Sequence, residues 1–168
     1  MPGRPSDYLA FRTPYAKQTG VEKAPMSTEK PTPIASITAK SIAPCGMNCG
    51  ICLARLREKN VCPGCNADDT SKPKTRKHCQ IKNCEELRTH GHQFCFECAK
   101  FPCTRLRNLD KRYRTKYGMS MIDNLESLRE VGLDRFVAME RSRWSCQGCG
   151  GVICVHRDDC MFCGHPRG

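Results

Sequence analysis

Apolar residues recur at helical spacing in the second half of the chain. Between residues 103 and 118 they fall three or four positions apart, which places them on one face of a helix. These positions are Leu106, Leu109, Tyr113 and Tyr117. Pro102 suits the first turn of this helix and Gly118 suits its end. The pattern therefore predicts an amphipathic helix from about residue 103 to Gly118.

Two more helices are predicted directly after this one. Ser120 and Asp123 form a motif like a capping box in which Asp replaces Glu or Gln, so a second helix begins there. Its apolar face continues to Gly132. A third short helix, at about 134–142, would bury the apolar residues Phe136, Val137 and Met139.

The rest of the chain gives weaker signals. Short helices are predicted at 50–59 and 84–89, and strands are signalled chiefly as short hairpins near the C-terminus. Residues 1–41 contain six prolines, no cysteine and only scattered apolar residues, which is typical of a disordered tail. We therefore expect one folded, cysteine-rich domain over residues 42–168.

The composition indicates that apolar packing alone does not hold this domain together. The hydrophobic fraction is 39%, but it includes fifteen cysteines, and without them about 30% remains, against ~45–50% in a typical globular domain. No apolar segment is long enough for a transmembrane helix, and no export signal is visible. The sequence therefore predicts a cytoplasmic protein that is stabilised by something other than a large core.

The fifteen cysteines favour metal binding over disulfides. Their number is odd, and disulfides are rare in a reducing cytoplasm. Because thiolates are the ligands, metal also changes the charge: three four-thiolate zinc sites would lower the formal net charge from +11 to about +5. Basicity is therefore a weak argument for nucleic-acid binding.

The C-terminal group contains two C-x2-C pairs that are separated by ten residues. Each pair can direct two sulfurs at one point, so two pairs close a tetrahedral zinc site. The pattern predicts a zinc ribbon over about residues 144–165, with a redox C-x2-C pair as the alternative. The predicted ligands are Cys146, Cys149, Cys160 and Cys163.

Two earlier groups predict two further zinc sites, which gives about three ions in all. The first set is Cys49, Cys52, Cys62 and Cys65, and the second set is Cys79, Cys84, Cys95 and Cys98. Cys45 is left over beside the first set, where it also completes a C-x3-C-x2-C spacing used by cluster-binding radical enzymes. Such enzymes need a barrel that this short chain cannot supply.

Four more residues are possible ligands. Cys103 follows Pro102 at a predicted helix start, where it is either a reactive thiol or a ligand that replaces Cys79 or Cys84. Cys154 and His156 lie within the predicted ribbon loop, where they are either a ligand pair or structural residues. Iron–sulfur is the main alternative to zinc, although the compact cysteine run of bacterial ferredoxins is absent.

The basic residues and the missing motifs bear on function. The run Lys72, Lys74, Arg76 and Lys77 is interpreted as a solvated linker, with phosphate binding as the alternative. No catalytic triad, phosphate-binding glycine loop or paired carboxylates are visible, and all-thiolate zinc sites are generally structural. These observations favour a protein that is not an enzyme.

Several spaced motifs resemble the prokaryotic cysteine-rich domain-of-unknown-function family 3795, which is presumed to bind zinc. They are Ala43-Pro44-Cys45-Gly46-Met47-Asn48-Cys49-Gly50-Ile51-Cys52, Cys62-Pro63-Gly64-Cys65, Phe94-Cys95-Phe96-Glu97-Cys98, Phe101-Pro102-Cys103, Tyr117-Gly118 with Asn124-Leu125, and the ending from Trp144 to Gly164. The resemblance covers about residues 42–165 and implies no reaction and no partner.

Together these observations predict a small, metal-stabilised, mainly α-helical protein with short β hairpins, zinc-knuckle segments and a C-terminal zinc ribbon. We expect it to be a non-enzymatic zinc module that binds a protein. A nucleic acid is the less favoured partner, and no membrane association is expected. The alternative is an iron–sulfur or thiol-based redox or metal-handling protein.

Overall fold

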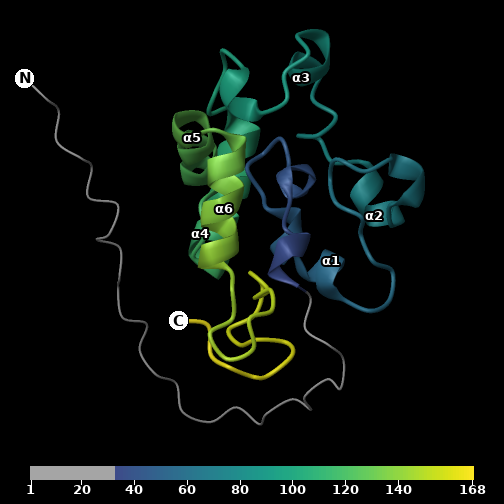
Figure 1. The fold of residues 1–168 in the computed structure, drawn as a ribbon. Helices are drawn as coiled ribbons and strands as arrows, with labels where there is room; N and C mark the ends of the chain where they lie inside the picture. Colours follow the sequence, from purple (N-terminus) through teal and green to yellow (C-terminus); the bar gives the residue numbers. More distant parts are fainter. Residues whose placement is uncertain (1–32) are drawn as a thin grey trace, which may run out of the picture.

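Three consecutive helices form the framework of the protein (Figure 1). In the computed structural model, which describes residues 33–168, these are α4 (Thr104–Tyr117), α5 (Met121–Val131) and α6 (Leu133–Arg143). Helix α5 packs against both α4 and α6. Their bounds lie within one or two residues of the predicted helices, so the mainly helical fold is confirmed.

The turn between α4 and α5 is fixed by a buried carboxylate. Asp110 on α4 accepts hydrogen bonds from the hydroxyl of Ser120 at 2.7 Å and from the backbone N–H of Ile122 at 3.1 Å. Ser120 in turn accepts from the N–H of Asp123 at 3.0 Å, as the capping motif predicted. Gly118 ends α4 at a φ of 65°, a conformation that glycine adopts without strain.

The core lies between these helices and the segments on either side of them. Its fully or almost fully buried side chains include Leu106, Met119, Met121, Leu125, Phe136, Val152 and Val155. The predicted burial of Met139 is wrong, because its side chain is 41% exposed. Met139 lies two positions beyond the buried Val137, which places it about 200° further around α6 and toward solvent.

The remaining segments are short. α1 (Leu53–Leu56), α2 (Lys74–Lys77) and α3 (Glu85–Thr89) join five 3-10 helices at Ile34–Ser36, Ala39–Ser41, Cys49–Ile51, Asp69–Ser71 and Cys95–Glu97. Figure 1 shows α1 and α2 on one side of the three-helix framework, and the C-terminal segment at its end. Among residues 33–168, no helix has the length and apolarity that crossing a membrane requires.

No extended strand forms between residues 33 and 168. The predicted hairpins are reduced to isolated bridges, two of which lie in the C-terminal segment and pair Ser145 with Val152 and Asp159 with Pro166. Cysteine and glycine turns occupy most of this segment, so only single pairs of residues remain to form a bridge.

The folded part begins earlier than the predicted Ile42. Ile37 is fully buried, and its carbonyl accepts a hydrogen bond from Arg141 on α6 at 2.8 Å. Pro33 also forms a bridge with Gly151. Only two large apolar residues, Ile34 and Ile37, fall among the small and polar residues of 33–41, too few to predict a helix or strand there. The rest of the predicted tail, residues 1–32, lies outside the described residues.

Candidate metal centres

Four sulfurs of the C-terminal segment converge on one point. The Sγ atoms of Cys146, Cys149, Cys160 and Cys163 all lie within 4.8 Å of one another. The sulfurs of Cys146 and Cys163 are 3.5 Å apart, and those of Cys149 and Cys160 are 3.7 Å apart. Tetrahedral zinc with ~2.3 Å bonds to sulfur needs separations of about 3.8 Å. This cluster could therefore hold a metal ion, as predicted, and within residues 33–168 it is the only such group of three or more ligands.

Two turns of the same shape bring these sulfurs together. In the first turn, Cys146 donates its N–H to Gly151 at 2.8 Å and accepts from Gly150 at 2.8 Å. In the second, Cys160 donates to His165 at 2.8 Å and accepts from Gly164 at 3.0 Å. Both turns close on a glycine with a φ near 70°, which side chains strongly disfavour. Each C-x2-C pair is therefore held by its own backbone.

The crowding of four sulfurs makes their ionisation unequal. Burial alone would raise the pKa of Cys146, but the N–H groups of Cys149 and Gly148, with the neighbouring thiols, lower it to about 7. The pKa of Cys149 is raised to about 12. Burial is the largest cause, and hydrogen bonds with the thiols of Cys163 and Cys146 also contribute. A bound dication would replace these protons, because metal ligands must be thiolates.

A second group of cysteines lines a much larger space. A cavity of about 250 Å³ lies beside α1 and α2, against Leu109 and Tyr113 of α4. It brings together the whole first predicted zinc set with one cysteine of the second set and the left-over cysteine. The six are Cys45, Cys49, Cys52, Cys62, Cys65 and Cys79.

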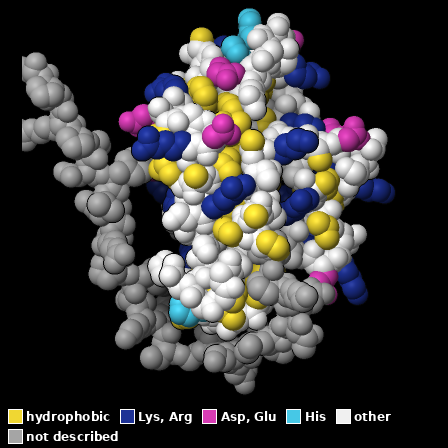
Figure 2. Space-filling model, in the orientation of Figure 1, with side chains coloured by type: hydrophobic (Ala, Val, Ile, Leu, Met, Phe, Trp, Pro, Cys, Tyr) yellow, Lys and Arg dark blue, Asp and Glu magenta, His cyan; other side chains and the backbone are white. Residues whose placement is uncertain are grey.

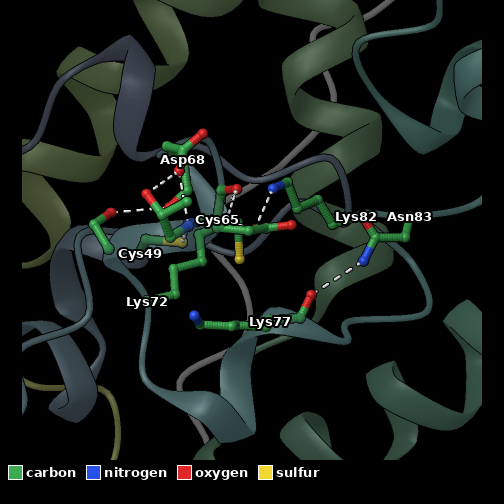
Figure 3. Close-up of polar contacts among 10 residues, drawn as sticks. Cys49, Cys65, Asp68, Lys72, Lys77, Lys82 and Asn83 are labelled. Atoms are coloured by element: carbon green, nitrogen blue, oxygen red, sulfur yellow. Dashed lines mark hydrogen bonds and ion pairs between the residues drawn. The ribbon is translucent and has the colours of Figure 1, made fainter.

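These six sulfurs are not gathered around a single point. Cys49 and Cys65 are adjacent, and the N–H of Cys65 lies 3.4 Å from the sulfur of Cys49 (Figure 3). The hydrogen bond between their thiols raises the pKa of Cys49 and lowers that of Cys65 to about 7. Burial raises the pKa of Cys45, and the nearby Cys65 and Cys79 raise it further. No three of the six come within the 4.8 Å that unites the C-terminal set.

Basic side chains surround this cavity, and no acidic residue lines it. The five are Arg55, Lys72, Arg76, Lys82 and Arg112. Lys72 is buried, and its ammonium group donates to the carbonyl of Cys65 at 2.8 Å and to Asp69 at 2.7 Å (Figure 3). The predicted solvated linker is therefore wrong at Lys72, and the residues after Pro73 form α2.

A third group of cysteines lines a small cavity of about 30 Å³ between α3 and α4. Its four cysteines come from the residue before α3, from the Cys95–Glu97 turn and its end, and from the residue before α4. They are Cys84, Cys95, Cys98 and Cys103. Cys103 takes the place in this set that the sequence predicted for Cys79. The exposed His90 and the nearby His92 do not line the cavity. Burial and the nearby Cys103 and Cys84 raise the pKa of Cys95 to about 12.

Cys154 and His156 lie outside the C-terminal cluster. Cys154 is fully buried, with its sulfur 4.0 Å from Nδ1 of His156. The same nitrogen accepts the N–H of Leu53 at 3.3 Å, and the other ring nitrogen lies 3.3 Å from the hydroxyl of Tyr113. Burial and nearby cations lower the pKa of His156, which favours the neutral ring. This pair joins the C-terminal segment to α1 and α4.

Comparison with known proteins supports the family resemblance for part of the chain. Residues 41–108 match the model of a family described as protein of unknown function, DUF3795. This segment contains all the cysteines that line the two cavities but stops before α5, α6 and the C-terminal cluster. No curated protein and no solved structure matches the chain.

Proposed function

We propose that the C-terminal cluster is a structural zinc site of the zinc-ribbon type, which holds the C-terminal segment on the helical framework. The observation that supports it is the convergence of four sulfurs within 4.8 Å. Zinc prefers four thiolates in a closed tetrahedron, and closed sites leave no position for a substrate. Two short cysteine turns with single bridges are a minimal form of such a ribbon.

We further propose that Cys84, Cys95, Cys98 and Cys103 form a second zinc site. Four thiols around about 30 Å³ offer a complete ligand set in a space of single-ion size. No three of these sulfurs lie within 4.8 Å of one another, so a zinc ion would have to draw the three loops inward. Cys103 replaces Cys79 in this set, so the ligand partition differs from the predicted one.

We propose that the assembled protein is a non-enzymatic binding module of the cytoplasm, with a protein as its partner. Fifteen unpaired thiols suit a reducing compartment. Leu53, Val61 and Met139 are exposed large apolar residues, and Figure 2 shows Lys and Arg side chains on the same face as hydrophobic ones. Such a surface suits a partner with both acidic and apolar groups better than bare phosphate.

Zinc analysis of the full chain, purified anaerobically, tests the zinc sites. We expect about two zinc ions per chain, with one lost in Cys160→Ser and the other in Cys98→Ser. A Cys160→Ser protein that keeps both ions would contradict the C-terminal site. For the partner, the test is nucleic-acid binding measured at increasing salt. Phosphate contacts weaken steeply with salt. Binding that stays tight would therefore not rest on phosphate contacts alone, and it would contradict the preference for a protein partner.

A further inference from the structure

The six-cysteine cavity does not fit the chemistry of a single zinc ion. One ion would need four sulfurs about 3.8 Å apart, whereas these six surround about 250 Å³, against about 30 Å³ in the small cavity, and no three of them lie within 4.8 Å of one another. A two-zinc centre with shared thiolates meets the same difficulty, because each of its ions also needs four sulfurs at that spacing. The C-terminal cluster of the same chain shows that close convergence is reached where the backbone provides it.

The volume of the cavity indicates a larger inorganic group. Its space of about 250 Å³ exceeds the ~150 Å³ of a cavity that holds a benzene molecule. In a cubane iron–sulfur cluster each cysteine binds a different iron, so the ligand sulfurs surround the group and stay well apart from one another. Widely spaced thiols around a roomy cavity match this arrangement.

The charges around the cavity match as well. A [4Fe–4S] centre with four thiolates carries about two negative charges in its oxidised form. Five Lys and Arg residues and no Asp or Glu line the cavity. Lys72 and Lys82 share Asp69 at 2.7 Å each, and Lys72 also donates to the Cys65 carbonyl at 2.8 Å (Figure 3). The other three, Arg55, Arg76 and Arg112, form no ion pair within residues 33–168, so net positive charge remains around the cavity.

We propose that this cavity binds a [4Fe–4S] cluster through four of its six cysteines. The cavity combines cysteines that sequence spacing assigned to two different zinc sites, and it is separate from the C-terminal cluster.

The test is reconstitution of the full chain with iron and sulfide under strictly anaerobic, reducing conditions. We expect about four iron and four acid-labile sulfide per chain, with brown absorbance near roughly 400 nm, while the zinc of the C-terminal cluster stays bound. Changing Cys49, Cys52, Cys62 and Cys65 to Ser leaves two thiols in the cavity, fewer than the three cysteines with which radical enzymes hold a cluster. That variant should lose most of the iron and sulfide and keep its zinc, whereas Cys160→Ser should lose zinc and keep the iron.

A second measurement uses the unaltered protein, in case the quadruple variant does not fold. Alkylation followed by peptide mass spectrometry should show that cavity cysteines react before reconstitution and are protected after it, with no change at Cys146 or Cys163. The proposal is overturned if iron and sulfide do not bind, if zinc alone fills and protects the cavity, or if iron is lost equally from Cys160→Ser.

Discussion

The C-terminal cluster and the six-cysteine cavity place the same side chain under different constraints. In the cluster, two self-contained turns direct four sulfurs to separations of 3.5–3.7 Å across two pairs. In the cavity, six sulfurs from separate loops surround about 250 Å³ and are bordered by five cations. Local backbone geometry therefore defines the first site, and tertiary packing defines the second.

This difference extends to how each site is joined to the helical framework. The cluster sits at the end of α6, and Arg167 beyond it donates to the carbonyl of Tyr117 at 3.2 Å. The cavity loop is anchored by buried polar side chains. Asn48 is fully buried and donates to Glu140 of α6 at 3.0 Å, and Asn124 of α5 donates to the carbonyl of Gly46 at 3.0 Å. We expect the cavity to tolerate metal loss better than the cluster.

The largest effect is expected from breaking the cluster. Cys149→Ser should remove one zinc ion and detach the C-terminal segment, because structural zinc contributes on the order of 10 kcal/mol of apparent folding free energy. Zinc content and chemical unfolding measure this change. Cys62→Ser in the cavity is the matched control and should lower the free energy of unfolding far less. Equal losses in both variants would show that the two regions do not differ as described.

A smaller effect is expected where the cavity loop meets α5. Gly46 has a φ of 82°, and an added Cβ would lie 2.6 Å from the carbonyl oxygen of Met121. Gly46→Ala should therefore lower the free energy of unfolding by about 3 kcal/mol, through backbone strain and steric overlap together. It should also reduce iron binding in the cavity.

Gly91→Ala is the control for this prediction. Gly91 also has a positive φ, of 65°, but nothing lies within 4 Å of the position that an added Cβ would take. Only the strain of about 1 kcal/mol should remain. Thermal or denaturant unfolding of the two variants gives the difference, and equal destabilisation would mean that the close approach to α5 contributes nothing.

The charge around the cavity gives a third prediction. Arg76 lines the cavity and lowers the pKa of Cys65, after the contributions of Cys49, Lys72 and Lys82. Removing a nearby positive charge disfavours the added electron, so Arg76→Ala should lower the reduction potential of the bound cluster by on the order of tens of millivolts. Lys77→Ala, on the same helix but outside the cavity lining, should leave it unchanged. A redox titration followed by absorbance separates the two, and equal shifts would remove Arg76 from the site.

The smallest effect concerns pH and Glu140. Burial raises the pKa of this carboxyl, although the hydrogen bond from Asn48 opposes the shift. A raised pKa means that the folded protein loses stability as pH increases from the ordinary Glu range through the folded pKa. Glu140→Gln keeps an acceptor for Asn48 and should flatten that decline. Glu126→Gln, at an exposed position of α5, should retain it, and an unchanged slope in Glu140→Gln would contradict the account.

The sequence predicted the elements whose information is local. The three long helices, the Ser120 cap, the Gly118 stop and the four cysteines of the C-terminal cluster all follow from spacing within a short stretch. The two C-x2-C pairs converge for the same reason, because each pair is organised by its own turn. The match of residues 41–108 to DUF3795 likewise confirms the resemblance that local motifs suggested.

What the sequence could not predict depends on contacts between distant segments. Spacing placed Cys79 with Cys84, but the fold sends Cys79 to the large cavity and brings Cys103 to the small one. Lys72 was interpreted as solvated, but packing buries it against Cys65. Ile37 belongs to the core only because α6 lies across it. No periodicity or motif in the sequence indicates these contacts.

The most direct test of the central claim is one analysis of zinc, iron and acid-labile sulfide in the same anaerobically prepared, reconstituted sample of the full chain. The account predicts about two zinc, four iron and four sulfide per chain, because the C-terminal cluster and the small cavity each suit a single ion and the large cavity encloses a cluster. Three zinc ions with no iron and no sulfide would contradict it, and would mean that all three cysteine groups bind metal in the same way.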